Sequence, residues 1–68
     1  MITVNGNIVV VDKTTNKAIL PFVGLSTDTK PTETFKGLAI VNGSTFFEMD
    51  TQDVYFYDGG AKSWLAQP

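Results

Sequence analysis

The chain lacks the side chains on which most enzymatic and metal chemistry depends. Its 68 residues include no cysteine, no histidine and no arginine. The missing cysteine excludes disulfide bonds and thiolate metal sites, and the missing histidine excludes imidazole ligands and any catalytic triad or dyad built on that base. Ser44 and Ser63 therefore have no imidazole to activate them as nucleophiles. We predict no catalytic residues, no metal ion and no cofactor.

Long apolar runs and concentrated positive charge are also missing. No run approaches the roughly 20 apolar residues that a membrane span needs. The first residues lack the basic start and apolar core of a signal peptide. The formal net charge is −2, and the five lysines are scattered rather than gathered into a basic patch. These features predict that the chain binds neither a membrane nor a nucleic acid. They also predict that it is made in the cytoplasm of its producing cell.

The small size of the chain predicts a single domain with limited stability of its own. A domain of this length buries a modest share of its surface, and such domains usually depend on disulfides, a metal ion or association with other chains. Because cysteine and histidine are absent, association is the means of support that remains open. We therefore expect a homo-oligomer or a chain that docks on a larger partner.

Short β-branched and aromatic runs between turn residues predict an all-β domain with about five or six short strands, little helix and a small antiparallel sheet. Asn5-Gly6 lies between two such runs, which predicts a hairpin of Ile2–Val4 with Ile8–Val11. The same residues would also suit a loose loop before one longer strand. Pro21 cannot donate to a sheet ladder, so its strand is expected at an edge or interrupted there.

A polar segment divides the chain into two parts. Residues 26–37 are rich in Thr, Asp and Pro and are predicted to form a loop and an internal boundary, with a short helical turn at 31–34. The part before it, residues 1–25, holds the N-terminal strands, which are candidates for pairing between subunits. The part after it, residues 38–68, is predicted to be an aromatic antiparallel meander.

Alternation along this meander predicts which side chains share a face. Phe46 and Glu48 point away from Phe47, and in the next strand Tyr55 and Tyr57 point away from Phe56. One face would cover the core of the domain. The other face, with residues such as Tyr55 and Tyr57, is predicted to be partly buried by something else, since exposed aromatic patches mark interaction surfaces. Core packing is the alternative for these rings and for Trp64, which is the one most expected to be buried because it ends the meander where it can fold back over the sheet.

Glu48 and Asp50 are two residues apart on one strand face, and this spacing allows three interpretations. Paired carboxylates serve glycosidases, and with Asp53 or Asp58 they would offer oxygens to calcium. The simpler interpretation is a solvated strand edge at which Asp50-Thr51 caps a turn through side-chain hydrogen bonds. We favour the simpler one, because the spacing matches no calcium-loop motif.

A series of short motifs runs along the same region. It consists of Lys30-Pro31-Thr32, Gly43-Ser44-Thr45-Phe46-Phe47, Glu48-Met49-Asp50-Thr51, Val54-Tyr55-Phe56-Tyr57-Asp58 and Trp64. From about Ser26 to Leu65 the chain thereby resembles a module of small virion-structural or fibre-type proteins of tailed bacteriophages and prophages. Asp53 departs from the pattern, where relatives tend to carry Gly or Lys, and residues 1–24 lie outside it.

The resemblance implies a non-enzymatic structural component of a phage particle, either a head decoration or the base of a head or tail fibre. Such a protein would be assembled into the virion in the host bacterial cytoplasm, docking on a capsid or tail protein and on copies of itself. Trimers are usual in fibres. Ile8 and Val10 are the predicted pairing residues of the N-terminal strands. The alternative is a carbohydrate-binding adsorption module in which Tyr55, Tyr57 and Trp64 stack on a host glycan.

Overall fold

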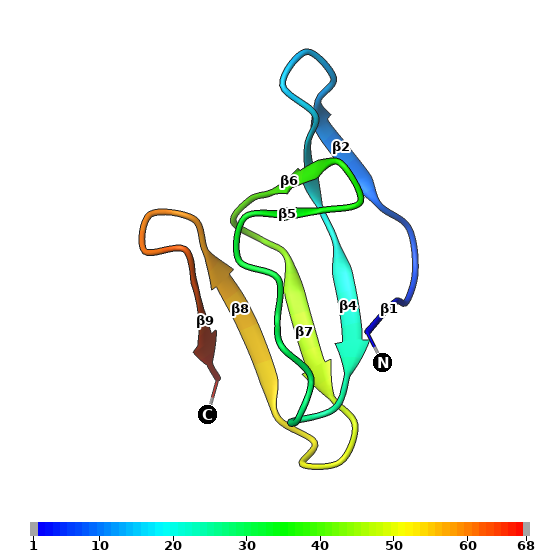
Figure 1. Ribbon diagram of the computed structural model, residues 1–68, viewed down its shortest axis with the longest axis vertical. Helices are drawn as coiled ribbons and strands as arrows, with labels where there is room; N and C mark the ends of the chain where they lie inside the picture. The colour runs from blue at the N-terminus through cyan, green and yellow to red at the C-terminus, as the bar shows by residue number, and fades with distance from the viewer. Residues whose placement is uncertain (1, 68) are drawn as a thin grey trace.

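The computed structural model describes residues 2–67, which form nine strands and no helix (Figure 1). The strands are β1 (Thr3–Val4), β2 (Val9–Asp12), β3 (Lys17–Ile19), β4 (Pro21–Gly24), β5 (Thr34–Phe35), β6 (Leu38–Ile40), β7 (Thr45–Glu48), β8 (Val54–Asp58) and β9 (Ser63–Ala66). The predicted all-β class is confirmed, with more and shorter strands than expected.

The strands form two sheets. One has five strands in the order β1-β4-β7-β8-β9, and the other has four in the order β2-β3-β6-β5. The predicted C-terminal meander is confirmed, because β7 pairs antiparallel with β8 and β8 with β9. Two parallel pairs, β4 with β7 and β3 with β6, were not foreseen from the sequence and make both sheets mixed.

Two extended segments run through both sheets and join them. Residues 17–24 supply β3 to the four-stranded sheet and β4 to the five-stranded one, and residues 38–48 supply β6 and β7 in the same way. Each segment is interrupted where it passes between sheets. At that point the Leu20 N–H donates to Ser44 Oγ at 3.1 Å, and the Thr45 N–H donates to the Leu20 carbonyl at 3.1 Å.

Pro21 explains the interruption of the first segment. It is the first residue of β4, a position where a missing N–H is tolerated. The predicted break at Pro21 is therefore confirmed, whereas the alternative of an edge strand is not, since β4 lies between β1 and β7. The Pro21 carbonyl still accepts a hydrogen bond from the Asn5 N–H at 2.8 Å.

The predicted N-terminal hairpin is wrong. β1 pairs with β4, and β2 pairs with β3, so Asn5-Gly6 connects two sheets instead of two paired strands. Pairing with β4 places Val4 opposite Phe22 and against the core, which buries more apolar surface than an isolated two-stranded hairpin can.

Residues 26–37 are mostly irregular, as predicted, but they contain β5, and residues 31–34 form no helical turn. They are also no boundary in space. Strands from residues 1–25 pair with strands from residues 38–68 in both sheets, so the two parts of the chain share one core. Within residues 2–67, the buried hydrophobic residues of that core are Ala18, Leu20, Phe22, Ile40, Phe46 and Tyr57.

Candidate interaction surfaces

Residues 26–37, here called the strap, cross one face of the five-stranded sheet and are fastened to it by aromatic side chains. The indole Nε1–H of Trp64 donates to the Pro31 carbonyl at 2.8 Å. The hydroxyl of Tyr57 donates to the neighbouring Thr32 carbonyl. Each bond satisfies the polar group of an aromatic side chain, which would otherwise be costly to bury. The strap-covered face, called the inner face, is thus closed by the chain itself.

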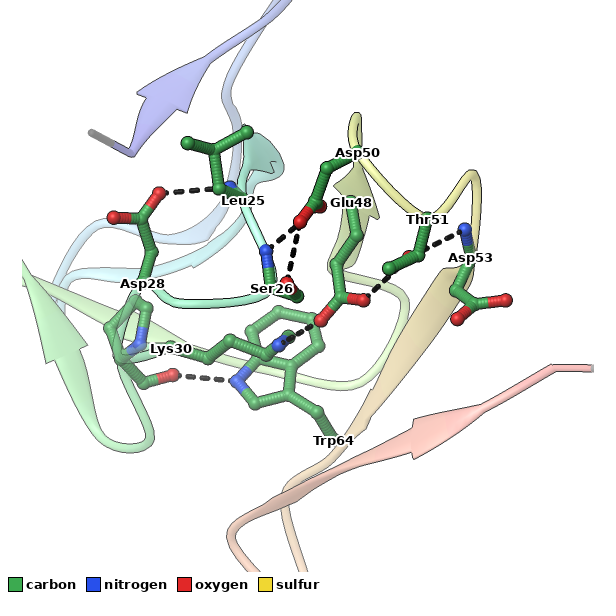
Figure 2. A network of polar contacts seen from close by, with 10 residues as sticks. Leu25, Ser26, Asp28, Lys30, Glu48, Asp50, Thr51, Asp53 and Trp64 are labelled. Carbon is green, nitrogen blue, oxygen red and sulfur yellow. Dashed lines mark hydrogen bonds and ion pairs between the residues drawn. The ribbon is translucent and has the colours of Figure 1, made fainter.

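An ion pair fastens the strap at a second place, which Figure 2 shows. Lys30 Nζ lies 2.6 Å from Glu48 Oε2, and it also stands over the rings of Phe46 and Tyr55 at 4.8 Å and 4.5 Å from their centroids. Thr51 Oγ1 donates to the other Glu48 oxygen at 2.8 Å. The hydrogen bond from Lys30, followed by that from Thr51, holds the pKa of Glu48 below its ordinary value. A buried carboxylate with both oxygens occupied is poorly placed to act as a general acid or as a metal ligand.

Asp50 fastens the start of the strap. Its two oxygens accept hydrogen bonds from the N–H and the hydroxyl of Ser26 at 3.0 Å and 2.5 Å (Figure 2). The hydroxyl bond is the largest of the effects that lower the pKa of Asp50. Thr51 Oγ1 also accepts from the Asp53 N–H at 3.3 Å, so the turn is capped by Thr51, while Asp50 reaches across to the strap. Among residues 2–67, no group of three or more acidic side chains is arranged to hold a metal ion.

Several residues of the motif series take part in these contacts. Its lysine, proline and first threonine (residues 30–32) are strap residues, and Glu48, Asp50, Tyr57 and Trp64 are groups that bind the strap. These residues therefore close the inner face of the sheet within the chain. Others in the same series, Phe47 and Phe56 among them, are exposed on the opposite face.

The prediction that Tyr55 and Tyr57 lie on a face left open for a partner is wrong, whereas the alternative of core packing, with burial expected most for Trp64, describes these rings better. Tyr57 is 5% exposed and belongs to the core, and the other two are half-buried against it. The rings of Tyr57 and Trp64 are 5.0 Å apart with planes inclined at 58°, so they form no flat platform. The physical reason is that their polar tips find acceptors in the strap. A contact between these rings and a partner stays a prediction.

The uncovered face is the opposite one, called the outer face. Register places two rows of side chains there, Thr3–Val23–Phe47–Val54 and Pro21–Thr45–Phe56–Leu65. Phe47, Phe56 and Leu65 are 38%, 47% and 49% exposed. Sequence reasoning identified the alternation correctly but chose the wrong face. The sequence did hold a signal for which face is covered: Phe and Leu, unlike Tyr and Trp, have no polar atom that must find an acceptor.

Strand β2 provides a second exposed apolar surface. It is an edge strand of the four-stranded sheet, and Val9, Val10 and Val11 are exposed on both of its faces, as is Ile8 just before it. In Figure 1 the β2–β3 hairpin projects from one end of the molecule. Ile8 and Val10 thus lie where an added strand would reach them, although their pairing with another chain stays a prediction.

Two clefts lie close to β2, one beside the preceding Ile8 and one beside Val11. A cleft of about 430 Å³ is lined mainly by apolar side chains, Ile8 and Phe35 among them. A second cleft of about 550 Å³ is bordered by Val11 and Ile19 and opens onto the Gly59-Gly60 turn. Neither gathers the convergent polar groups that usually orient a small ligand, so both fit a protein contact better than a substrate.

Comparison with known proteins finds no matching family model, no matching curated protein and no matching solved structure. Within residues 2–67 there is no helix of the length and apolar character that crossing a bilayer requires. The two exposed apolar surfaces are the features of residues 2–67 that bear most directly on function.

Proposed function

We propose that the protein is a non-catalytic structural component of a bacteriophage particle, a head decoration or fibre base, that docks on a capsid or tail protein and on copies of itself. The observation that carries the proposal is the division of the molecule. The acidic side chains at the strap are engaged in internal bonds, and two apolar surfaces are left open. A chain arranged in this way is suited to binding other proteins.

Strand β2 supports the docking half of the proposal. An edge strand presents unpaired backbone N–H and C=O groups, and natural proteins normally protect such edges with lysine, proline or a bulge. The Val9–Val11 stretch carries neither charge nor proline. Its only irregularity is a register shift between Val10 and Asp12, on the side that faces β3. A strand of a capsid or tail protein could add to the free side, with Ile8 and Val10 contributing side-chain contacts.

The carbohydrate-binding alternative has less support. It needs exposed, coplanar rings, whereas Tyr57 and Trp64 are inclined and packed in the core. The open rings, Phe47 and Phe56, have mainly apolar side chains as their direct register neighbours. Phage-structural docking therefore fits the distribution of polar and apolar groups better.

Copurification with particles tests the proposal. The tagged chain would be supplied to cells producing the phage that encodes it, and gradient-purified particles would be probed for the tag. We expect the wild-type chain to copurify at a fixed ratio to the major capsid protein, and Val10→Lys to be depleted. Thr14→Lys, which adds the same charge in the exposed β2–β3 turn, is the matched control and should copurify normally. Absence of the wild-type chain from particles would contradict the proposal.

A further inference from the structure

We infer that the outer face of the five-stranded sheet is a self-association surface, on which a second copy of this chain packs face to face. The inference concerns the purified chain alone and does not depend on the virion assignment. It rests on three properties of the outer face: its charge, its shape and its area.

The two central rows of the outer face carry no charge. None of the eight residues in its two rows is ionisable, and the rows run across all five strands. The nearest acid in the register, Asp58, lies at the rim opposite Ser63 and accepts hydrogen bonds from the Gly60 and Ala61 N–H groups of the following turn. A charged partner surface would lose hydration here without gaining an ion pair. The outer face of a second copy has the same uncharged rows, and every copy of the chain in solution carries one.

The shape of the outer face suits a two-fold partner. Each exposed ring has a smaller side chain beside it: Phe47 lies between Val23 and Val54, and Phe56 lies next to Thr45. A two-fold axis lets the rings of one copy settle over the smaller side chains of the other, because each patch meets its own image. Sheets packed in this manner lie about 10 Å apart, which is the spacing of an ordinary β-sandwich core.

The area of the face sets the strength of the contact. The five strands hold 19 residues, which at about 3.3 Å per residue and about 4.8 Å between strands give a face of about 300 Å². A standard stable interface buries about 800 Å² per partner. The total surface, 4349 Å², is close to the roughly 4200 Å² expected for a monomer of 7.4 kDa. The monomer is therefore complete as a fold, and the dimer should be weak and reversible.

A weak contact of this kind becomes effective when copies are held close together. Two chains anchored side by side on a particle would meet at a high effective concentration, which converts a weak association into a firm one without any new contact. Free in dilute solution, the same chains would separate.

Sedimentation equilibrium of the purified chain, from about 10 µM to about 1 mM, tests the inference. We expect a monomer–dimer equilibrium whose dimer is populated in the upper part of that range. Phe56→Lys and Leu65→Lys, which each place an ammonium on the outer face, should raise the dimer dissociation constant by about tenfold or more. Circular dichroism and thermal melting would show that both variants remain folded, as expected for exposed positions.

Thr14→Lys is the matched control, because it adds the same charge at an exposed residue of the β2–β3 turn, which belongs to neither apolar surface. It should leave the dimer constant unchanged. A chain that stays monomeric to 1 mM, a dimer insensitive to both outer-face lysines, or an oligomer abolished by Val10→Lys would each overturn the inference. The particle experiment depends on Val10, whereas this one depends on Phe56 and Leu65, so either proposal can fail without the other.

Discussion

Phe46 and Phe47 are neighbours in sequence and carry identical rings, but Phe46 is fully buried and Phe47 is 38% exposed. They belong to the two faces of β7, and the whole five-stranded sheet repeats their difference. Both faces are rich in apolar side chains, so hydrophobicity alone does not decide which of them is covered. What differs is the presence of polar tips: Tyr57, Trp64 and Glu48 all stand on the inner face, and each binds the strap.

This difference suggests a division of labour between the two faces. Buried hydroxyl, indole and carboxylate groups need specific partners, which a covalently attached segment supplies at a fixed position. Phe and Leu require only an apolar neighbour and tolerate exposure until one arrives. The inner face is thus suited to intramolecular closure, and the outer face to a contact that forms and breaks.

Among the variants considered, truncation of Phe46 should lower the free energy of unfolding most. Phe46→Ala removes a ring packed against Phe22 and Trp64 and is expected to cost about 3–5 kcal/mol. A core of this size supplies about 3–5 kcal/mol in total, so the variant should be largely unfolded at 25 °C. Phe47→Ala should cost less than about 1 kcal/mol, as is typical of exposed positions. Urea denaturation followed by circular dichroism measures both, and equal losses would contradict the assignment of faces.

Gly24→Ala should have the next largest effect, because the inner face leaves no room beside this residue. An added Cβ would lie 2.8 Å from the far edge of the Phe46 ring and 3.0 Å from Asp28 Oδ2. Overpacking of this kind typically costs about 1–3 kcal/mol. Phe46→Leu would relieve the ring contact, so the double variant should lose less stability than the sum of the single losses. Strict additivity in denaturation midpoints would show that Phe46 does not limit the space.

Much of this comparison could be predicted from the sequence. The all-β class follows from short β-branched and aromatic runs between turn residues, and the meander follows from its alternation and its polar turns. The period of two correctly separated Phe46 and Glu48 from Phe47. Such features are local, and the residues that determine them lie within a few positions of one another.

What the sequence did not reveal depends on distant contacts. The parallel pairs join strands more than 20 residues apart, and the Asn5-Gly6 signal for a hairpin was outweighed by the burial of Val4 beside Phe22. The identity of the covered face was missed for the same reason. It depends on carbonyl groups of Pro31 and Thr32, whose position in space no local pattern specifies.

A smaller effect is expected from the tyrosine hydroxyl that fastens the strap. Tyr57→Phe keeps the ring in the core but removes the donor to the Thr32 carbonyl, which should cost about 0.5–1.5 kcal/mol. Tyr55→Phe is the matched control on the same strand and face, since it keeps the ring that lies beneath Lys30. Urea midpoints should therefore fall for the first variant and change little for the second. The reverse order would place the fastening point of the strap at Tyr55.

Acid should loosen the strap before it disturbs the outer face, and this is the mildest of the expected effects. The pKa values of Glu48 and Asp50 are lowered by the bonds that these groups accept, chiefly from Lys30 and from the Ser26 hydroxyl. A lowered folded-state pKa stabilises the fold fully above the ordinary values of about 4.3 for Glu and 3.9 for Asp. That contribution is lost as pH falls below them through the folded-state values, because the unfolded chain then binds more protons.

The Trp64 indole N–H signal reports the bond between the strap and the sheet. On acidification it should shift below about pH 4 while the backbone signals of Phe56 and Leu65 remain in place. Glu48→Gln should move the strap toward its loosened state already at neutral pH and weaken the response to acid. If the indole signal and the outer-face signals instead change together at one midpoint, the strap does not open separately, and the inner face is held by the global fold instead of by its own set of bonds.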